Sequence, residues 1–292
     1  MALRQTREKG NGMETTRRSR RALTGLAFAL ATTSAQAATG LMFDPAIAVS
    51  TNDAANNAFK AKMGWISYKS GPTQAQYDVK AQIMVYADGA AGGQNIWIAR
   101  SVDNGASWGQ QKITTSGGMS TGLIVDPVAP TNTGTFTINH NKPNIYVAPI
   151  GVINVGKGAD ALATWTSSDC SDTGNVTGDL VGPPPAQRIN TNLALPQPFM
   201  CLWTARSFDG GISWVKQRLT DGSLDPDEDV PAGYVKYTLD TASTGGFAIS
   251  YQADPAGLKL GEAEGPGEGA SGAAVNPGTN IWYTFLSKAA FE

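Results

Sequence analysis

Residues 101–108 read SVDNGASW, and residues 207–214 read SFDGGISW. The likeness extends outward from these two stretches: when residues 96–114 are aligned with residues 202–220, ten of the 19 positions are identical. Self-similarity over this length is typical of a repeated supersecondary unit. The sequence therefore predicts that one structural element is built twice.

Each copy has the pattern of two strands joined by a tight turn. Apolar and aromatic residues lead into Asn104-Gly105 or Gly210-Gly211, and the chain continues through Trp108 or Trp214. These dipeptides accept the positive φ angles of two-residue hairpin turns. The shared polar positions also have a structural explanation, because Asp103 and Asp209 can accept hydrogen bonds from N–H groups of their own turns. The positions expected to have this structural role are Ser101, Asp103, Gly105, Ser107 and Trp108, and Ser207, Asp209, Gly211, Ser213 and Trp214.

The pattern S-x-D-x-G-x-S-W resembles the Asp-box, or BNR repeat, of sialidases and related β-propellers. The resemblance covers residues 80–290 and implies an all-β fold of four-stranded antiparallel blades, with the boxes on the face away from the functional site. The composition agrees with this fold class, since short Val-, Ile- and Tyr-containing runs alternate with Gly, Pro, Asn and Ser.

A second repeated feature is a strand that ends in aspartate before each copy. IMVYAD ends at Asp88, LATWTSSD at Asp169 and AISYQAD at Asp254, and a third partner strand, NIWYTFLS, follows at 280–287 without a box. Because neighbouring strands are antiparallel, the loops after these aspartates should lie at the end opposite the boxes. Two of these loops are long insertions, 171–200 and 255–279. Insertions on one face of a repeat fold are common binding sites.

The number of blades is small for a propeller. At about 45–60 residues for each four-stranded blade, the chain is long enough for fewer blades than form the closed ring of the sialidases that it resembles. The expectation is a small or incomplete ring, and three explanations stay open: a smaller propeller, a ring completed by another chain, or a fragment of a longer protein.

Residues 1–37 have the order of a secretory signal: a basic run, an apolar stretch and a small-residue exit at Ala35-Gln36-Ala37. The stretch SRRAL resembles a twin-arginine export signal, although ordinary secretion is the alternative route. We therefore expect a secreted or periplasmic protein whose β-propeller domain occupies residues 38–292.

The charge of that domain disfavours two classes of partner. Residues 1–37 hold seven of the 22 basic residues and two of the 24 acidic residues, so 15 basic and 22 acidic residues remain. An acidic chain does not suit nucleic acid or an anionic membrane surface, both of which are bound through Lys and Arg. No further apolar run is long enough to predict a membrane span.

Cys170 and Cys201 flank the larger insertion. In an exported protein they are expected to form a disulfide, which stabilises a loop of this length by about 3–4 kcal/mol. Two isolated buried thiols are the alternative.

Candidates for catalysis are few. The resemblance implies an arginine triad, a tyrosine nucleophile with a glutamate, and an aspartate acid/base, but residues 38–292 hold only four arginines, and two of them precede a box. A glycosidase needs two facing carboxylates. The remaining hypothesis for hydrolysis therefore uses Asp88, Asp169 or Asp254, which recur at one position of the repeat, together with a tyrosine or a second acid. The alternative for each aspartate is that it caps its turn. Tyr86, Tyr251 and Arg188 are the candidate ligand-binding residues.

Two further features concern metal binding. His140 is the only histidine, which excludes a two-histidine metal site within the chain. The acidic run after the second box could bind calcium through Asp225, Asp227 and Asp229, and a solvated acidic turn is the alternative.

The sequence thus predicts an exported β-propeller that acts as a non-catalytic binding or surface-assembly module for a glycan or protein ligand. A sialidase-like glycoside hydrolase is the alternative.

Overall fold

The computed structural model describes residues 48–50, 57–70, 78–90, 92–147, 160–171, 186–191, 195–226, 232–236, 245–254 and 280–287. The signal expected over residues 1–37, the calcium candidates Asp227 and Asp229, and the insertion 255–279 lie outside these residues, as does most of the insertion 171–200.

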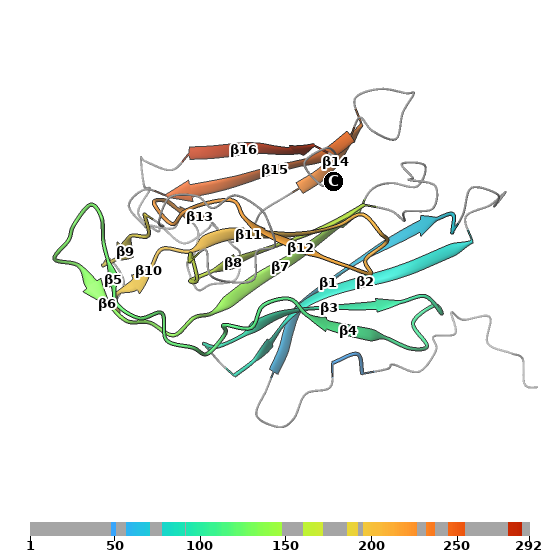
Figure 1. The fold of residues 1–292 in the computed structure, drawn as a ribbon, viewed down its shortest axis with the longest axis horizontal. Helices are drawn as coiled ribbons and strands as arrows, with labels where there is room; N and C mark the ends of the chain where they lie inside the picture. The colour runs from blue at the N-terminus through green and yellow to red at the C-terminus, as the bar shows by residue number, and fades with distance from the viewer. Residues whose placement is uncertain are drawn as a thin grey trace, which may run out of the picture. The chain divides into compact units, whose positions relative to one another are not determined.

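The first sheet is a four-stranded antiparallel meander (Figure 1). Its strands are β1 (Asn57–Tyr68), β2 (Val79–Gly89), β3 (Asn95–Ser101) and β4 (Gly109–Lys112), and neighbours in the sheet are neighbours in the sequence. The first box connects the third strand, β3, to the fourth, β4.

The second sheet repeats this order. Its strands are β7 (His140–Val147), β8 (Ala161–Ser167), β11 (Cys201–Ser207) and β12 (Val215–Arg218), again antiparallel. The second box connects β11 to β12, so the two boxes occupy equivalent places in the two sheets.

The third sheet is centred on β15 (Gly245–Asp254), which pairs with β16 (Asn280–Ser287) along one edge. Along its other edge β15 pairs with β13 (Asp225–Pro226) and then with β14 (Ala232–Lys236). Two short pairs, β5 (Ile124–Val125) with β6 (Thr133–Gly134) and β9 (Ile189–Asn190) with β10 (Gln197–Pro198), belong to the connections.

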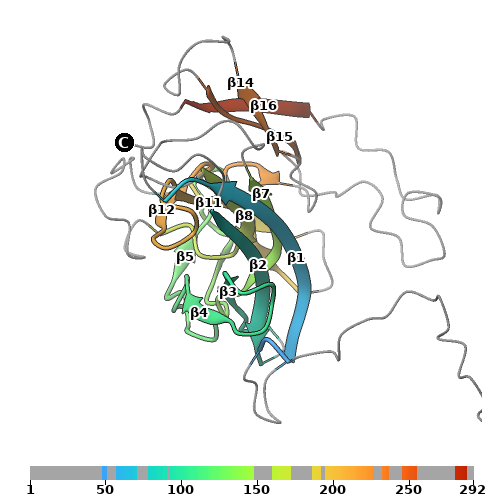
Figure 2. The same cartoon turned by 90° about the vertical axis from the view of Figure 1, so that its right-hand side faces the viewer.

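The expected all-β class, antiparallel four-stranded sheets and three hairpins are confirmed. The described residues contain strands and turns and no helix, so none of them forms a helix that could cross a membrane. The three four-stranded sheets of these residues follow one another in succession and form no closed ring (Figure 2).

The middle sheet is buried on both faces. Toward the first sheet, Ala163 and Trp165 pack with Ile83 and Ile98 in one apolar cluster. Toward the third sheet, Leu162 packs with Phe247 in a second cluster. The alternation follows from strand geometry, because successive side chains point to opposite faces. A strand that contacts apolar neighbours on both sides accordingly contains no exposed residue.

The two box turns share one hydrogen-bond pattern. Asp103 accepts a bond from Ser107 N at 2.9 Å, and Asp209 accepts one from Ser213 N at 3.0 Å. Positive φ angles occur at Asn104-Gly105 and Gly210-Gly211, as predicted. The prediction of two-residue hairpins is wrong, however: residues 102–108 and 208–214 connect the strands. The reason is that the Asp side chain accepts a hydrogen bond from the residue four positions later and so stabilises a longer loop. The dipeptide with positive φ angles lies in the middle of this loop.

The second box is also a contact between sheets. Arg100 Nε donates to Gly210 O at 2.8 Å, and the Arg100 guanidinium donates to the Tyr68 hydroxyl at 3.0 Å. A Cβ at Gly210 would lie 2.5 Å from the Tyr68 ring. Glycine is therefore required at this position by its φ of 78° and by the close approach of the first sheet.

We expect Gly210→Ala to lower the free energy of unfolding by roughly 1–3 kcal/mol, because the new methyl group meets Tyr68 and the backbone is held at positive φ. Chemical denaturation measures the change. Gly109→Ala is the matched control, since a Cβ there has its nearest neighbour at 3.9 Å. Equal stability of the two variants would contradict the close contact.

Candidate functional site

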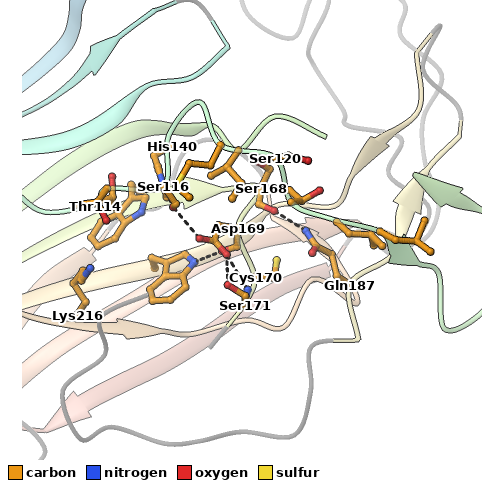
Figure 3. A pocket seen from close by; sticks show the side chains of 18 of the residues that line it. Thr114, Ser116, Ser120, His140, Ser168, Asp169, Cys170, Ser171, Gln187 and Lys216 are labelled. Carbon is orange, nitrogen blue, oxygen red and sulfur yellow. Dashed lines mark hydrogen bonds between the residues drawn. The ribbon is translucent and has the colours of Figure 1, made fainter. Parts of the chain in front are cut away.

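A pocket of about 650 Å³ lies where the first two sheets meet, at the end away from the boxes. The register fixes this end: Ser167 pairs with Cys201 here, whereas Ala161 pairs with Ser207 where the second box begins. Asp169, two residues beyond β8, lies among the lining side chains (Figure 3). We call this hollow the Asp169 pocket.

Asp169 is held through both its backbone and its side chain. Its N–H donates to Ser167 Oγ at 2.9 Å, and its carbonyl oxygen accepts a bond from Trp203 Nε1 at 2.8 Å. Oδ1 accepts bonds from Ser171 N and Oγ, and Oδ2 accepts one from Ser116 Oγ at 2.9 Å. The carboxylate is thus fixed in direction before any ligand is present.

Ser116 lies between Asp169 and His140. Its Oγ is 2.9 Å from Asp169 Oδ2 and 2.9 Å from His140 Nε2. A hydroxyl has one proton, and here it is donated to Asp169. His140 Nε2 therefore donates to Ser116, and the lone pair of the neutral ring is on Nδ1.

His140 is 3 % exposed, and its Nδ1 has no hydrogen-bond partner among the described residues. Burial lowers its pKa to about 4; Asp169 opposes the shift, and Lys216 and Lys112 add to it. The imidazole is consequently neutral at neutral pH.

This arrangement does not activate a nucleophile. In a Ser-His-Asp triad the histidine lies between the other two and removes the serine proton. In the Asp169 pocket the serine is in the middle and donates its hydrogen bond to the carboxylate. Ser116 is therefore a positioning residue for Asp169.

The loop that brings Ser116 to the pocket is held by Asn95. Asn95 Oδ1 accepts bonds from Thr114 Oγ1 at 3.1 Å and from Gly117 N at 2.9 Å. A Cβ at Gly117 would lie 2.3 Å from Gln94 O, so only glycine lets the loop approach the β2–β3 connection this closely. The first sheet thereby supplies one wall of the pocket.

The lining is rich in hydroxyl groups, with apolar side chains at the rim. The hydroxyl residues are Thr114, Thr115, Ser116, Ser120, Thr121, Ser168 and Ser171. Met119, Leu123 and Val125 also line the pocket and are exposed. Lys216 contributes an ammonium whose pKa is lowered by burial, with Asp169 opposing the shift. The pocket thus offers many donors and acceptors and one group of each charge sign in addition to His140.

The expected disulfide between Cys170 and Cys201 is present, with the two Cα atoms 5.5 Å apart. Cys170 is next to Asp169 in the sequence and lines the same pocket. The covalent link therefore fixes the end of β8 to the start of β11 directly beside the carboxylate.

The three repeated aspartates lie at equivalent ends of three different sheets. Asp88 is opposite Asn95 in the first sheet, and Asp254 is opposite Asp225 in the third. Of the three, only Asp169 lines the Asp169 pocket. The structure does not bring them together as a pair of carboxylates.

The candidate ligand-binding residues have different environments. Tyr86 is 2 % exposed, and burial together with Asp88 raises its pKa to about 12. Arg188 lies with its Nε 3.7 Å from Asp126 Oδ1 and stacks over the Phe199 ring. Tyr251 is half-buried and lines a second pocket, described below.

The calcium hypothesis has one described candidate. Asp225 is 4 % exposed, and its Oδ1 accepts a bond from Met200 N at 2.9 Å. Within the described part of the chain, no group of three or more His, Cys, Asp or Glu side chains could hold a metal ion.

One repeated signal was missed in the sequence. In each sheet, an aromatic residue of one central strand is directly opposite a tryptophan of the next strand. The three cross-strand pairs are Tyr86 with Trp97, Trp165 with Trp203, and Tyr251 with Trp282. Aligning the three partner strands on their first residues would have revealed the tryptophans, because each is at the third position of its strand. The repeated aspartates do not align the opposite aromatic residues, which lie two, four and three positions before Asp88, Asp169 and Asp254.

No protein-family model and no curated protein sequence matches the chain.

We expect the free energy of unfolding to fall by about 3 kcal/mol as the pH is lowered from about 6.5 to about 4. The unfolded chain binds a proton at His140 with a pKa of 6.5, whereas the folded protein does so at about 4. In this window the unfolded state holds more protons and is favoured as the pH falls. Denaturation at a series of pH values measures the slope.

His140→Gln is the control for this effect. Its free energy of unfolding should change much less over the same window, while the loss caused by protonating Asp103, whose pKa is lowered to about 2 by Ser107 and Ser101, remains at more acidic pH. The same slope in both proteins would show that His140 is not the group responsible.

We expect reduction of the disulfide, or its replacement in a Cys170→Ala and Cys201→Ala double variant, to lower the free energy of unfolding by about 3–4 kcal/mol, because the unfolded chain gains the freedom of the enclosed loop. Denaturation with and without reductant measures this. Reductant should not change the double variant, and a reductant effect there would point to another cause.

Proposed function

We propose that the chain is an exported Asp-box β-propeller module that binds a glycan without hydrolysing it, and that the sugar occupies the Asp169 pocket. The repeated sheets and the box hydrogen bonds support the propeller assignment. The disulfide supports export, since such bonds persist in oxidising compartments. A surface-assembly role with another chain completing the ring is compatible with this module.

The observation that carries the proposal is the hydroxyl-rich lining around an oriented carboxylate. Asp169 accepts three described hydrogen bonds, while an ionised carboxylate has about four acceptor sites. Among the described residues, one acceptor site of Asp169 is therefore left for a hydroxyl of a ligand. Small-molecule pockets commonly combine apolar walls with a few fixed polar groups of this kind.

The alternative function, a sialidase-like glycoside hydrolase, has less support. Asp169 is the single carboxylate among the described lining residues, and most glycosidases use two. Arg100 is bonded to Gly210 O and Tyr68 at the box end of the sheets, so it is not available to bind a substrate carboxylate in this pocket. The described pocket thus favours binding over turnover.

A glycan array probed with the oxidised protein tests the proposal, with released sugar assayed in the same wells. We expect binding without sugar release, and at least about tenfold weaker binding for Asp169→Asn and Lys216→Met, which corresponds to about 1.4 kcal/mol. Val102→Thr, an exposed change within the first box and away from the pocket, is the matched control and should bind normally.

Three results would contradict the proposal. Sugar release that is lost in Asp169→Asn would favour the hydrolase. Unchanged binding by both pocket variants would place the site elsewhere. Absence of binding to every glycan would favour a protein ligand. Thermal unfolding of each variant separates loss of the site from loss of the fold.

A further inference from the structure

A second pocket, of about 390 Å³, has Tyr251 and Trp282 of the third sheet in its lining. Its other lining residues, among them Thr220, Asp221 and Arg218, come from the end of β12 and the loop that follows. We call it the Trp282 pocket.

The aromatic residues show that the two pockets are equivalent. Trp165 and Trp203 are a cross-strand pair of the second sheet and line the Asp169 pocket. Tyr251 and Trp282 are the corresponding pair of the third sheet and line the Trp282 pocket. The aromatic pair therefore occupies equivalent cross-strand positions in the second and third sheets and lines a pocket in each case.

The opposite walls are equivalent as well. Thr114 follows β4 and its Oγ1 accepts a bond from Ile96 N at 2.9 Å; Thr220 follows β12 and its Oγ1 accepts one from Leu202 N at 2.9 Å. Both threonines occupy the last position of the 19-residue repeat, and each lines the pocket of its own junction. Each pocket is thus formed by the end of one sheet and the aromatic pair of the next.

The Trp282 pocket differs in being more open. Trp165 and Trp203 are 1 % and 4 % exposed, whereas Trp282 is 41 % exposed. Asp221 accepts a bond from Ser223 N at 3.0 Å. Burial raises the pKa of Asp221, but the hydrogen bonds from Ser223 and the charge of Arg218 lower it overall. An indole surface is therefore available beside a fixed carboxylate and a guanidinium.

We propose that the Trp282 pocket is a second saccharide site, so that the protein binds a neutral sugar at each of two successive sheet junctions. This rests on the proposed function of the Asp169 pocket, whose architecture it repeats. The C–H face of a sugar ring packs on the exposed indole. Neighbouring hydroxyls donate to Asp221 and accept from Arg218.

A neutral sugar fits these groups better than an anionic one. Asp221 faces the pocket with a negative charge that would repel a ligand carboxylate, and the Arg218 guanidinium already donates a hydrogen bond to Cys170 O. The pair can instead bind two adjacent hydroxyl groups, one as donor and one as acceptor.

Nuclear magnetic resonance can report on the two pockets separately, because each contains an indole N–H. In nitrogen-labelled oxidised protein, the Trp203 signal reports on the Asp169 pocket and the Trp282 signal on the Trp282 pocket. The probes are the methyl glycosides of glucose, galactose, mannose, N-acetylglucosamine and fucose. We expect at least one probe to shift both signals in a saturable manner.

Paired variants assign each response. Asp221→Asn should weaken the titration of the Trp282 signal about tenfold and leave that of the Trp203 signal unchanged. Lys216→Met should have the opposite effect. Both changes keep the size of the side chain, and Trp282→Phe identifies the Trp282 signal and keeps an aromatic ring in the pocket if a truncation to alanine does not fold.

The outcomes separate the two proposals. If the Trp203 signal shifts and the Trp282 signal does not respond to any probe, the second site is wrong and the proposed function stands. If only the Trp282 signal shifts, the second site stands and the assignment of function to the Asp169 pocket is wrong. If neither signal shifts, both are overturned.

Discussion

The burial of the second sheet on both faces is the constraint on which the rest of the structure depends. Its two central strands, β8 and β11, contain no exposed residue. A polar group within such strands must find its partner inside the protein, because leaving it unpaired costs free energy. Polar side chains that could bind a ligand are therefore concentrated where the strands end. One end is closed by the box turn, and the other has the pocket.

The two ends have different polar chemistry. At the box end, each aspartate accepts bonds from the serines and N–H groups of its own turn, and the second turn is also bonded to Arg100 of the first sheet. These groups satisfy one another. At the opposite end, Asp169 and Ser116 come from different sheets and meet across a junction. A polar cluster formed between two sheets has space and hydrogen-bond acceptors available for a ligand. A box turn, whose polar groups bond to one another, does not.

The sequence predicted local features well and contacts between sheets poorly. The repeat at 96–114 and 202–220 identified the paired strands, and the positive φ angles followed from Asn104-Gly105 and Gly210-Gly211. Cys170 and Cys201 were paired correctly because both flank one insertion. These inferences depend on residues close together in the repeat.

The pocket could not be derived in this way. Ser116 and Asp169 are 53 positions apart, and nothing in either segment shows that the two sheets stack so as to bring them together. Asp169 was selected for its repeated position, but the other two candidates selected in this way, Asp88 and Asp254, belong to other sheets. The sequence showed of His140 only that it is the single histidine, and its buried contact with Ser116 depends on the same packing.

Because each pocket is formed by the end of one sheet and the aromatic pair of the next, no single sheet contains all the residues of a pocket. Duplication of a single sheet would copy both its aromatic pair, which belongs to one pocket, and the residues after its last strand, which belong to the next pocket. The junction between the two copies would then combine these two parts into a new pocket. Divergence acts differently: a mutation in the loop after β12 alters one junction, and a mutation in β16 alters the same junction from the other side. In the proposed function, ligand preference would therefore depend on pairs of neighbouring sheets, and the number of binding sites on the number of junctions between sheets.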